Sequence, residues 1–233
     1  MTKSTHNILL IHGALGSSKI FDELKSHLSH QNNIYSIDLL GYGVYSEEKE
    51  VNVTKLCSQI IDYIEINNLQ GINVFGYSMG GYLSLMIGLQ RPDIFNHIIT
   101  LGTKFEWNES IANKEVQLVT SFMQLPNEHP FKKLQFELHG ESAFYNCIQV
   151  TCNLISEIGK NSYLTDDRLS HLNLPVLLLI GEQDNMVSQS ETQVVYEAIP
   201  NAKLLVLPET KHPLEKVNKL MLANIIENRL AKQ

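Results

Sequence analysis

The chain has 233 residues, with 18 Lys and Arg against 25 Asp and Glu, which gives a net charge of −7. Hydrophobic residues make up 43 % and charged residues 18 %, a balance typical of a folded globular protein and not of a disordered chain. The acidic balance, without any run of Lys or Arg, argues against a nucleic-acid-binding function, because that function needs clustered positive side chains.

The N-terminal region and the cysteines indicate a cytoplasmic protein. The first apolar run, Ile8–Ile11, is shorter than the apolar region of a secretory signal. No apolar stretch approaches the roughly 20 residues of a membrane-spanning helix. Three cysteines, Cys57, Cys147 and Cys152, are an odd number, which fits a reducing compartment. We expect no membrane partner and no metal, and a monomer or weak homodimer.

Short apolar segments alternate with longer helical patterns along most of the chain. The expected strands are Asn7–His12, Asn33–Leu39, Ile72–Tyr77, His97–Leu101, Val176–Ile180 and Lys203–Leu207. Most of them are continuously apolar, which is typical of strands buried on both faces of a parallel sheet. The expected helices are Val53–Asn67, Met79–Leu89, Gln189–Ala198 and Leu214–Ala231. This alternation predicts an α/β fold with a doubly wound, about six-stranded parallel sheet.

One long segment interrupts the alternation. From Lys104 to Leu172 the sequence has no strand pattern and carries scattered aromatic residues on helical stretches. We interpret it as a helical cap, residues 104–172, inserted between two parts of the core, residues 1–103 and 173–233. The alternative is a set of overlong crossover helices.

The pentapeptide Gly76-Tyr77-Ser78-Met79-Gly80 lies between a predicted strand and a predicted helix. Its two outer glycines, Gly76 and Gly80, permit a sharp turn and close strand–helix packing. Ser78 then projects at the N-terminus of the helix, where the helix dipole favours a developing negative charge. This context predicts Ser78 as a nucleophile. The alternative is a tight turn with an incidental serine.

A serine nucleophile needs a base, and the base needs an orienting acid. Asp184 follows the predicted strand Val176–Ile180, and His212 follows the next predicted strand. Both residues therefore lie at the same sheet edge as Ser78, where sites form in open α/β sheets. The order Ser, Asp, His is the order expected for this arrangement. We predict a catalytic triad of these three, with Glu182 and Asp167 as alternative acids.

The segment His12-Gly13-Ala14-Leu15-Gly16 follows the first predicted strand. Acyl transfer requires N–H donors for the oxyanion of the tetrahedral intermediate. We expect these donors to be the backbone N–H groups of Ala14 and Met79. The candidate substrate-binding residues are Leu15, Tyr77 and Trp107.

Together these motifs resemble the α/β-hydrolase superfamily. The resemblance covers nearly the whole chain through HGALGSS, DLLGYG, GYSMGG, GEQD and KHP. It implies a sheet that lacks the two N-terminal strands of the family, a helical lid, and a Ser–His–Asp mechanism without metal or cofactor. Two departures stand out. The loop Gly41–Ser46 is one residue longer than usual, and Lys211 replaces the common glycine before the histidine.

The expected reaction is hydrolysis of a small acyl ester through an acyl-enzyme. The same triad could cleave a thioester, an amide or a C–C bond. It could also serve an acyltransferase or a lyase of the menaquinone pathway, although that lyase needs basic residues and the arginines lie outside the motifs. A non-catalytic receptor that kept the fold is the remaining alternative.

Overall fold

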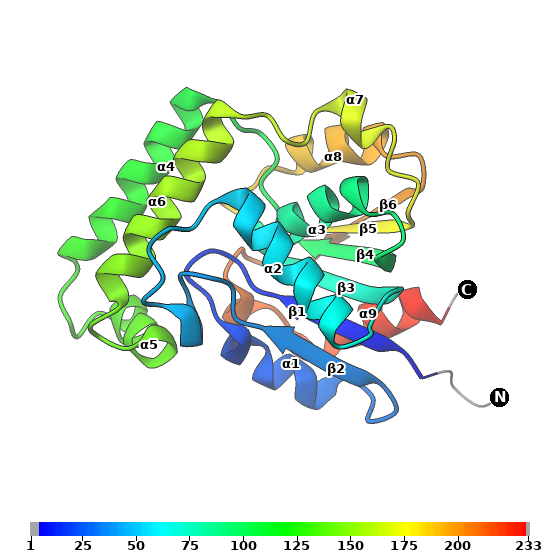
Figure 1. Ribbon diagram of the computed structural model, residues 1–233, viewed down its shortest axis with the longest axis horizontal. Coiled ribbons are helices and arrows are strands. Elements are labelled where there is room, and N and C mark those ends of the chain that lie inside the picture. The colour runs from blue at the N-terminus through cyan, green and yellow to red at the C-terminus, as the bar shows by residue number, and fades with distance from the viewer. Residues whose placement is uncertain (1–4, 232–233) are drawn as a thin grey trace.

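The computed structural model describes residues 5–231 and contains one parallel sheet (Figure 1). Its 6 strands are arranged in the order β2-β1-β3-β4-β5-β6, and every neighbouring pair is parallel. Their bounds are β1 Asn7–Ile11, β2 Asn33–Ile37, β3 Ile72–Tyr77, β4 Phe95–Leu101, β5 Val176–Gly181 and β6 Ala202–Leu207. The predicted α/β class and the six-stranded parallel sheet are therefore confirmed.

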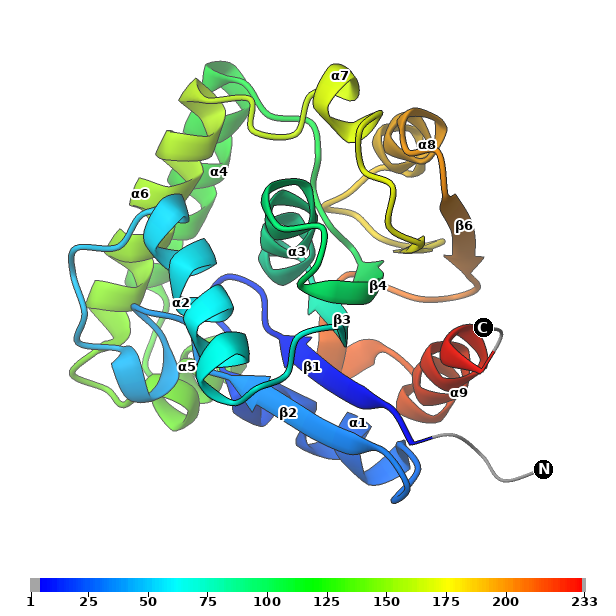
Figure 2. The ribbon, with the colours of Figure 1, turned by 45° about the vertical axis from the view of Figure 1, so that its right-hand side comes forward.

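Helices cover both faces of the sheet (Figure 2). Side chains alternate between the faces along each strand. Ile8 and Leu10 pack in the apolar layer that contains α1 (Asp22–His27) and α9 (Lys219–Leu230). Leu9 and Ile11 pack in the opposite layer, with α2 (Val53–Ile66) and α3 (Met79–Gln90). The helix α8 (Gln189–Ala198) joins this second layer through Val195. Burial on both faces explains why the central strands are apolar throughout.

The segment between β4 and β5 is helical. It contains α4 (Glu109–Ser121), the 3₁₀ turn η3 (Phe122–Gln124), α5 (Pro130–His139), α6 (Phe144–Lys160) and α7 (Asp166–Leu169). α4 and α6 lie side by side at one end of the sheet in both views (Figures 1 and 2). α5 begins with Pro130, which suits a first helical position because it needs no N–H partner there. We keep the term cap for residues 104–172, and the division into 1–103, 104–172 and 173–233 stays a prediction.

Three details differ from the sequence expectations. The helix α1 was not predicted, because six residues are too few for a clear helical period. The predicted helix Leu214–Ala231 is wrong at its start: a 3₁₀ turn, η4 (Leu214–Lys216), precedes extended backbone at Val217, and α9 begins at Lys219. The edge strand β6 is partly exposed: Leu205 and Val206, whose side chains point to opposite faces of the sheet, both contact solvent. Among the helices of residues 5–231, none has the length and apolarity needed to span a membrane.

Candidate active site

Ser78 lies in a strained turn between β3 and α3. Its backbone has φ 52° and ψ −116°, a conformation that residues with a Cβ atom rarely adopt. The flanking glycines are required by space: a Cβ on Gly76 would lie 2.5 Å from the backbone of Gly80, and one on Gly80 would collide with the carbonyl of Ile11. The turn leaves Ser78 half-buried, before the first residue of α3, so that the unpaired N–H groups of that helix end lie beside it.

Asp184 and His212 are hydrogen-bonded to each other. Asp184 Oδ2 lies 2.8 Å from His212 Nδ1, and the two side chains are only 2 % and 7 % exposed. Burial alone would raise the pKa of Asp184, but the hydrogen bond and the charge of His212 oppose this. The N–H groups of Met186 and Val187 also donate to Asp184 Oδ1, and the pKa of Asp184 lies below its usual value. Asp184 is therefore an ionised acceptor that orients the imidazole.

The two alternative acids do not contact His212. Glu182 accepts a hydrogen bond from the N–H of Glu209 at 2.9 Å. Asp167 lies on α7, in the cap. Of the three carboxylates considered, Asp184 is the one that the fold brings to the histidine.

Ser78 and His212 line the same cavity, of about 390 Å³, between the sheet edge and the cap. No hydrogen bond joins Ser78 Oγ to the His212 ring, and Nε2 is the nitrogen of His212 that Asp184 leaves available. The cap contributes mostly apolar lining side chains, among them Val119, Phe122, Phe131, Leu134, Leu138, Leu154, Ile155 and Ile158. The cavity therefore suits a largely apolar ligand.

The predicted oxyanion donors border this cavity. Ala14 and Met79 both line it, and Met79 is the first residue of α3, where a backbone N–H has no partner within the helix. His12, at the start of the first loop, is fully buried, and its Nδ1 lies 2.7 Å from the carbonyl oxygen of Gly13. Burial lowers the pKa of His12 to about 4, so the ring is neutral at pH 7.

The candidate substrate-binding residues Leu15, Tyr77 and Trp107 also line the cavity. Tyr77 donates its hydroxyl to the carbonyl oxygen of His212 at 3.0 Å, and its ring lies 5.6 Å from the His212 ring. Trp107 Nε1 donates to the carbonyl oxygen of Lys104 at 3.0 Å. The polar atoms of both rings are thus used within the protein, and the rings present apolar surface.

Polar side chains also line the cavity, and among these Gln135 and Glu215 were not predicted from the sequence. Lys104 forms an ion pair with Glu115 of α4 at 3.6 Å, and its Nζ lies over the Trp107 ring. Gln135 of α5 and Glu215 of η4 also line the cavity. No spacing signal in the sequence separates Gln135 or Glu215 from ordinary surface residues, because cap helices and loops can pack in many ways.

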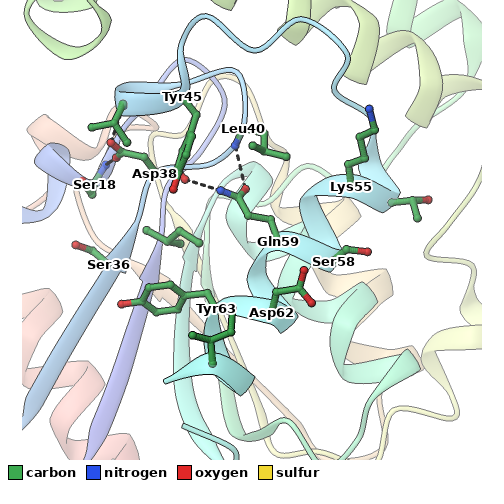
Figure 3. A pocket seen from close by; sticks show the side chains of 14 residues that line it. Ser18, Ser36, Asp38, Leu40, Tyr45, Lys55, Ser58, Gln59, Asp62 and Tyr63 are labelled. Atoms are coloured by element: carbon green, nitrogen blue, oxygen red, sulfur yellow. Dashed lines mark hydrogen bonds between the residues drawn. The ribbon is translucent and has the colours of Figure 1, made fainter. Parts of the chain in front are cut away.

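A second, more open hollow of about 700 Å³ lies between β2 and α2, away from Ser78 (Figure 3). The side chain of Gln59, on α2, connects this helix to the backbone that follows β2. Its Nε2 donates to the carbonyl oxygen of Asp38 at 3.0 Å, and its Oε1 accepts from the N–H of Leu40 at 2.9 Å (Figure 3). The Asp38 carboxylate accepts from the N–H groups of Ser18 and Val44. Asp38 thus holds two loops in place. Within residues 5–231, no group of three or more His, Cys, Asp or Glu side chains could hold a metal ion.

Comparison with known proteins agrees with this fold. The sequence profile described as alpha/beta hydrolase fold matches residues 7–135, more than half of the chain. The chain is 24 % identical over 228 residues to the uncharacterized hydrolase YugF of Bacillus subtilis, covering 88 % of this chain and 82 % of that protein. A shorter match, 23 % identical over 101 residues, covers 42 % of this chain and 30 % of ethanol acetyltransferase 1 of Cyberlindnera jadinii.

Solved structures share the fold over the whole chain. MGS-M2, an alpha/beta hydrolase enzyme from a Medee basin deep-sea metagenome library, superposes with a TM-score of 0.80 at 14 % identity, over 100 % of this chain and 92 % of that one. A carboxylesterase structure from the ammonia-oxidizing thaumarchaeon Nitrososphaera gargenis gives a TM-score of 0.78 at 18 % identity, over 97 % and 90 % of the two chains. At these identities the likeness concerns the fold.

Proposed function

The chain belongs to the alpha/beta hydrolase fold family, and from this premise we propose that it is a serine hydrolase that cleaves a small acyl ester. The observation that carries the proposal is the buried Asp184–His212 hydrogen bond at the rim of a cavity that also contains Ser78. An activated nucleophile is recognised by a base that is itself oriented by a third group. The strained turn at Ser78 supports the same assignment.

In the proposed mechanism, Ser78 Oγ attacks the acyl carbonyl carbon while His212 Nε2 accepts its proton. Asp184 holds the imidazole by Nδ1 and stabilises the imidazolium without taking up a proton. The N–H groups of Met79 and Ala14 stabilise the oxyanion. His212 then protonates the leaving alcohol, and water activated by the same histidine releases the acid and restores Ser78.

The choice of an uncharged ester rests on the lining of the cavity. Most of its side chains are apolar, and Lys104 is the only lysine or arginine among the described lining residues. Because Glu115 already pairs with Lys104, little positive charge is left for an anionic substrate. This favours an ester or thioester over the substrate of a lyase that binds anionic groups.

The experiment is intact-mass spectrometry after exposure to an alkyl fluorophosphonate, with wild type beside Ser78→Ala. We expect one adduct on the wild type and none on the variant. A panel of p-nitrophenyl esters, thioesters and amides then identifies the bond that is cleaved. A folded wild type that takes up no adduct would contradict the proposal and favour a receptor-like protein that kept the fold.

We further propose that the protein acts in the cytoplasm as a monomer or weak homodimer. Cys57, Cys147 and Cys152 are all free and buried, as expected in a reducing compartment. Light scattering after size-exclusion chromatography gives the oligomeric state. A stable higher oligomer would contradict this part of the proposal.

A further inference from the structure

Gln135 is an unpaired polar residue in the apolar wall of the cavity. It lies on α5 between the lining residues Leu134 and Leu138, and it is only 2 % exposed. Its Oε1 is buried without a hydrogen-bond partner. Its Nε2 donates no hydrogen bond to any of the described residues either.

Several other polar groups of the cavity wall have partners within the protein. Thr151 Oγ1 lies 2.8 Å from the Tyr42 hydroxyl and also donates to the carbonyl oxygen of Cys147. Lys104 and Glu115 pair with each other. The only other buried side-chain polar atoms without a partner in the described part of the chain are Ser17 Oγ and Arg229 Nε, and neither residue lines the cavity.

An unpaired amide in an apolar wall destabilises the folded state, because it has lost its hydrogen bonds to water without replacing them. Most buried polar groups in proteins have a partner, so an exception in a ligand cavity points to a partner on the ligand. An amide offers both an acceptor and a donor, and a hydroxyl group can satisfy either of them.

We propose that Gln135 is a specificity-determining residue that hydrogen-bonds a hydroxyl group on the part of the substrate bound beneath the cap. The inference rests on the proposed hydrolase function and narrows its substrate class. The preferred ester carries an apolar chain that ends in a hydroxyl group, and a plain alkyl ester of the same length leaves the amide unpaired. A site with a buried hydrogen-bonding group discriminates strongly against an analogue that lacks the matching group.

The test compares kcat/KM for pairs of esters with equal numbers of heavy atoms. In the acyl series the pairs are the p-nitrophenyl esters of 6-hydroxyhexanoate and heptanoate, and of 8-hydroxyoctanoate and nonanoate. In the alcohol series the pairs are 4-hydroxybutyl and pentyl acetate, and 6-hydroxyhexyl and heptyl acetate. The series that shows the preference identifies which part of the substrate lies beneath the cap.

Three proteins are compared: wild type, Gln135→Met and Gln149→Met. Methionine keeps the length of the side chain and removes the amide. Gln149 is the matched control, because it lies on the exposed side of α6 and donates its amide to Asn153. We expect wild type to prefer the hydroxy ester at least tenfold in one series. Gln135→Met should lower that ratio to about one, and Gln149→Met should keep it.

A wild-type ratio near one in both series, or a ratio that survives in Gln135→Met, would overturn this inference and leave the hydrolase proposal standing. Absence of both ester turnover and a fluorophosphonate adduct on Ser78 would overturn the two together. If the adduct forms without ester turnover, the preference is measured from labelling rates instead. The rate with a hydroxyalkyl fluorophosphonate is then divided by the rate with the matching alkyl fluorophosphonate. The melting temperature of Gln135→Met is compared with that of the wild type. A value equal to or above the wild-type value establishes that a changed ratio does not come from misfolding.

Discussion

The Nε2 atom of His12 accepts a hydrogen bond from the backbone N–H of Leu39 at 3.0 Å, which joins the loop after β1 to the end of β2. An N–H partner at Nε2 places the ring proton on Nδ1, which donates to the carbonyl oxygen of Gly13. That carbonyl and the N–H of Ala14 belong to one planar trans peptide and point in opposite directions. His12 therefore fixes the direction of a proposed oxyanion donor without contacting the substrate.

We expect His12→Ala to lower kcat by up to about 10²–10³, the usual cost of losing one oxyanion donor. KM should change much less, because the ring acts on the transition state through the Ala14 N–H. Steady-state kinetics on an ester that the wild type cleaves measures both constants.

His97→Ala is the matched control, because His97 is also buried and its ring lies 3.1 Å from Asn73 Oδ1, near the opposite edge of the sheet. It should lose stability and keep the wild-type kcat. Equal losses of kcat in the two histidine variants would refute a positioning role for His12.

The same histidine makes stability depend on pH. Burial lowers the pKa of His12 from 6.5 to about 4. In the unfolded chain His12 therefore takes up a proton below pH 6.5, whereas in the folded protein it takes one up only below about pH 4. The free energy of unfolding consequently decreases as the pH falls from 6.5 to about 4. The loss for this group approaches ~1.4 kcal/mol per pH unit.

Urea unfolding at pH 6.5, 5.5 and 4.5 measures how the free energy of unfolding depends on pH. This dependence should be weaker in His12→Ala than in the wild type, by ~1.4 kcal/mol per pH unit. Parallel curves would show that the folded protein protonates His12 as easily as the unfolded chain does.

Asp184→Asn should lower kcat on the order of 10³–10⁴, because asparagine favours the wrong tautomer of His212. The pKa of Asp184 lies below its ordinary value of 3.8, so its ionised form stabilises the fold above that pH. The stability of the wild type relative to Asp184→Asn should be constant above about pH 5 and should fall as the pH drops below 3.8. A relative stability that rises on acidification would contradict the depressed pKa.

Ser78→Gly should unfold at a higher urea concentration than Ser78→Ala. Both variants lack the hydroxyl group, but only glycine adopts φ 52° without strain, and we expect a difference of about 1 kcal/mol. At Ser84, inside α3, the order should reverse, because glycine costs about 1 kcal/mol more than alanine in a helix. The same order at both positions would mean that the turn at Ser78 is relaxed.

Much of the site could be predicted because its residues occupy strand ends. The elbow around Ser78 is marked by glycines whose positions leave no room for a Cβ, and Asp184 and His212 each follow an apolar strand. In a parallel sheet all such strand ends meet at one edge, so their proximity follows from the order of the elements. The ends of the helices were predicted less accurately. α9 starts later than its apolar pattern suggests, because the Asn218 side chain caps the helix by accepting a hydrogen bond from the Met221 N–H.

The amino-acid sequence by itself determined the fold class, the sheet and the residues proposed for the triad, because periodicity, glycine spacing and chain order express them locally. Only the tertiary structure decided which acid contacts His212, how His12 holds the first loop, and that Gln135 lies in the wall of an apolar cavity with its Oε1 unpaired. These facts depend on how cap and loops pack against the sheet. Long-range packing of that kind brings together residues far apart in the chain, and no local pattern records it.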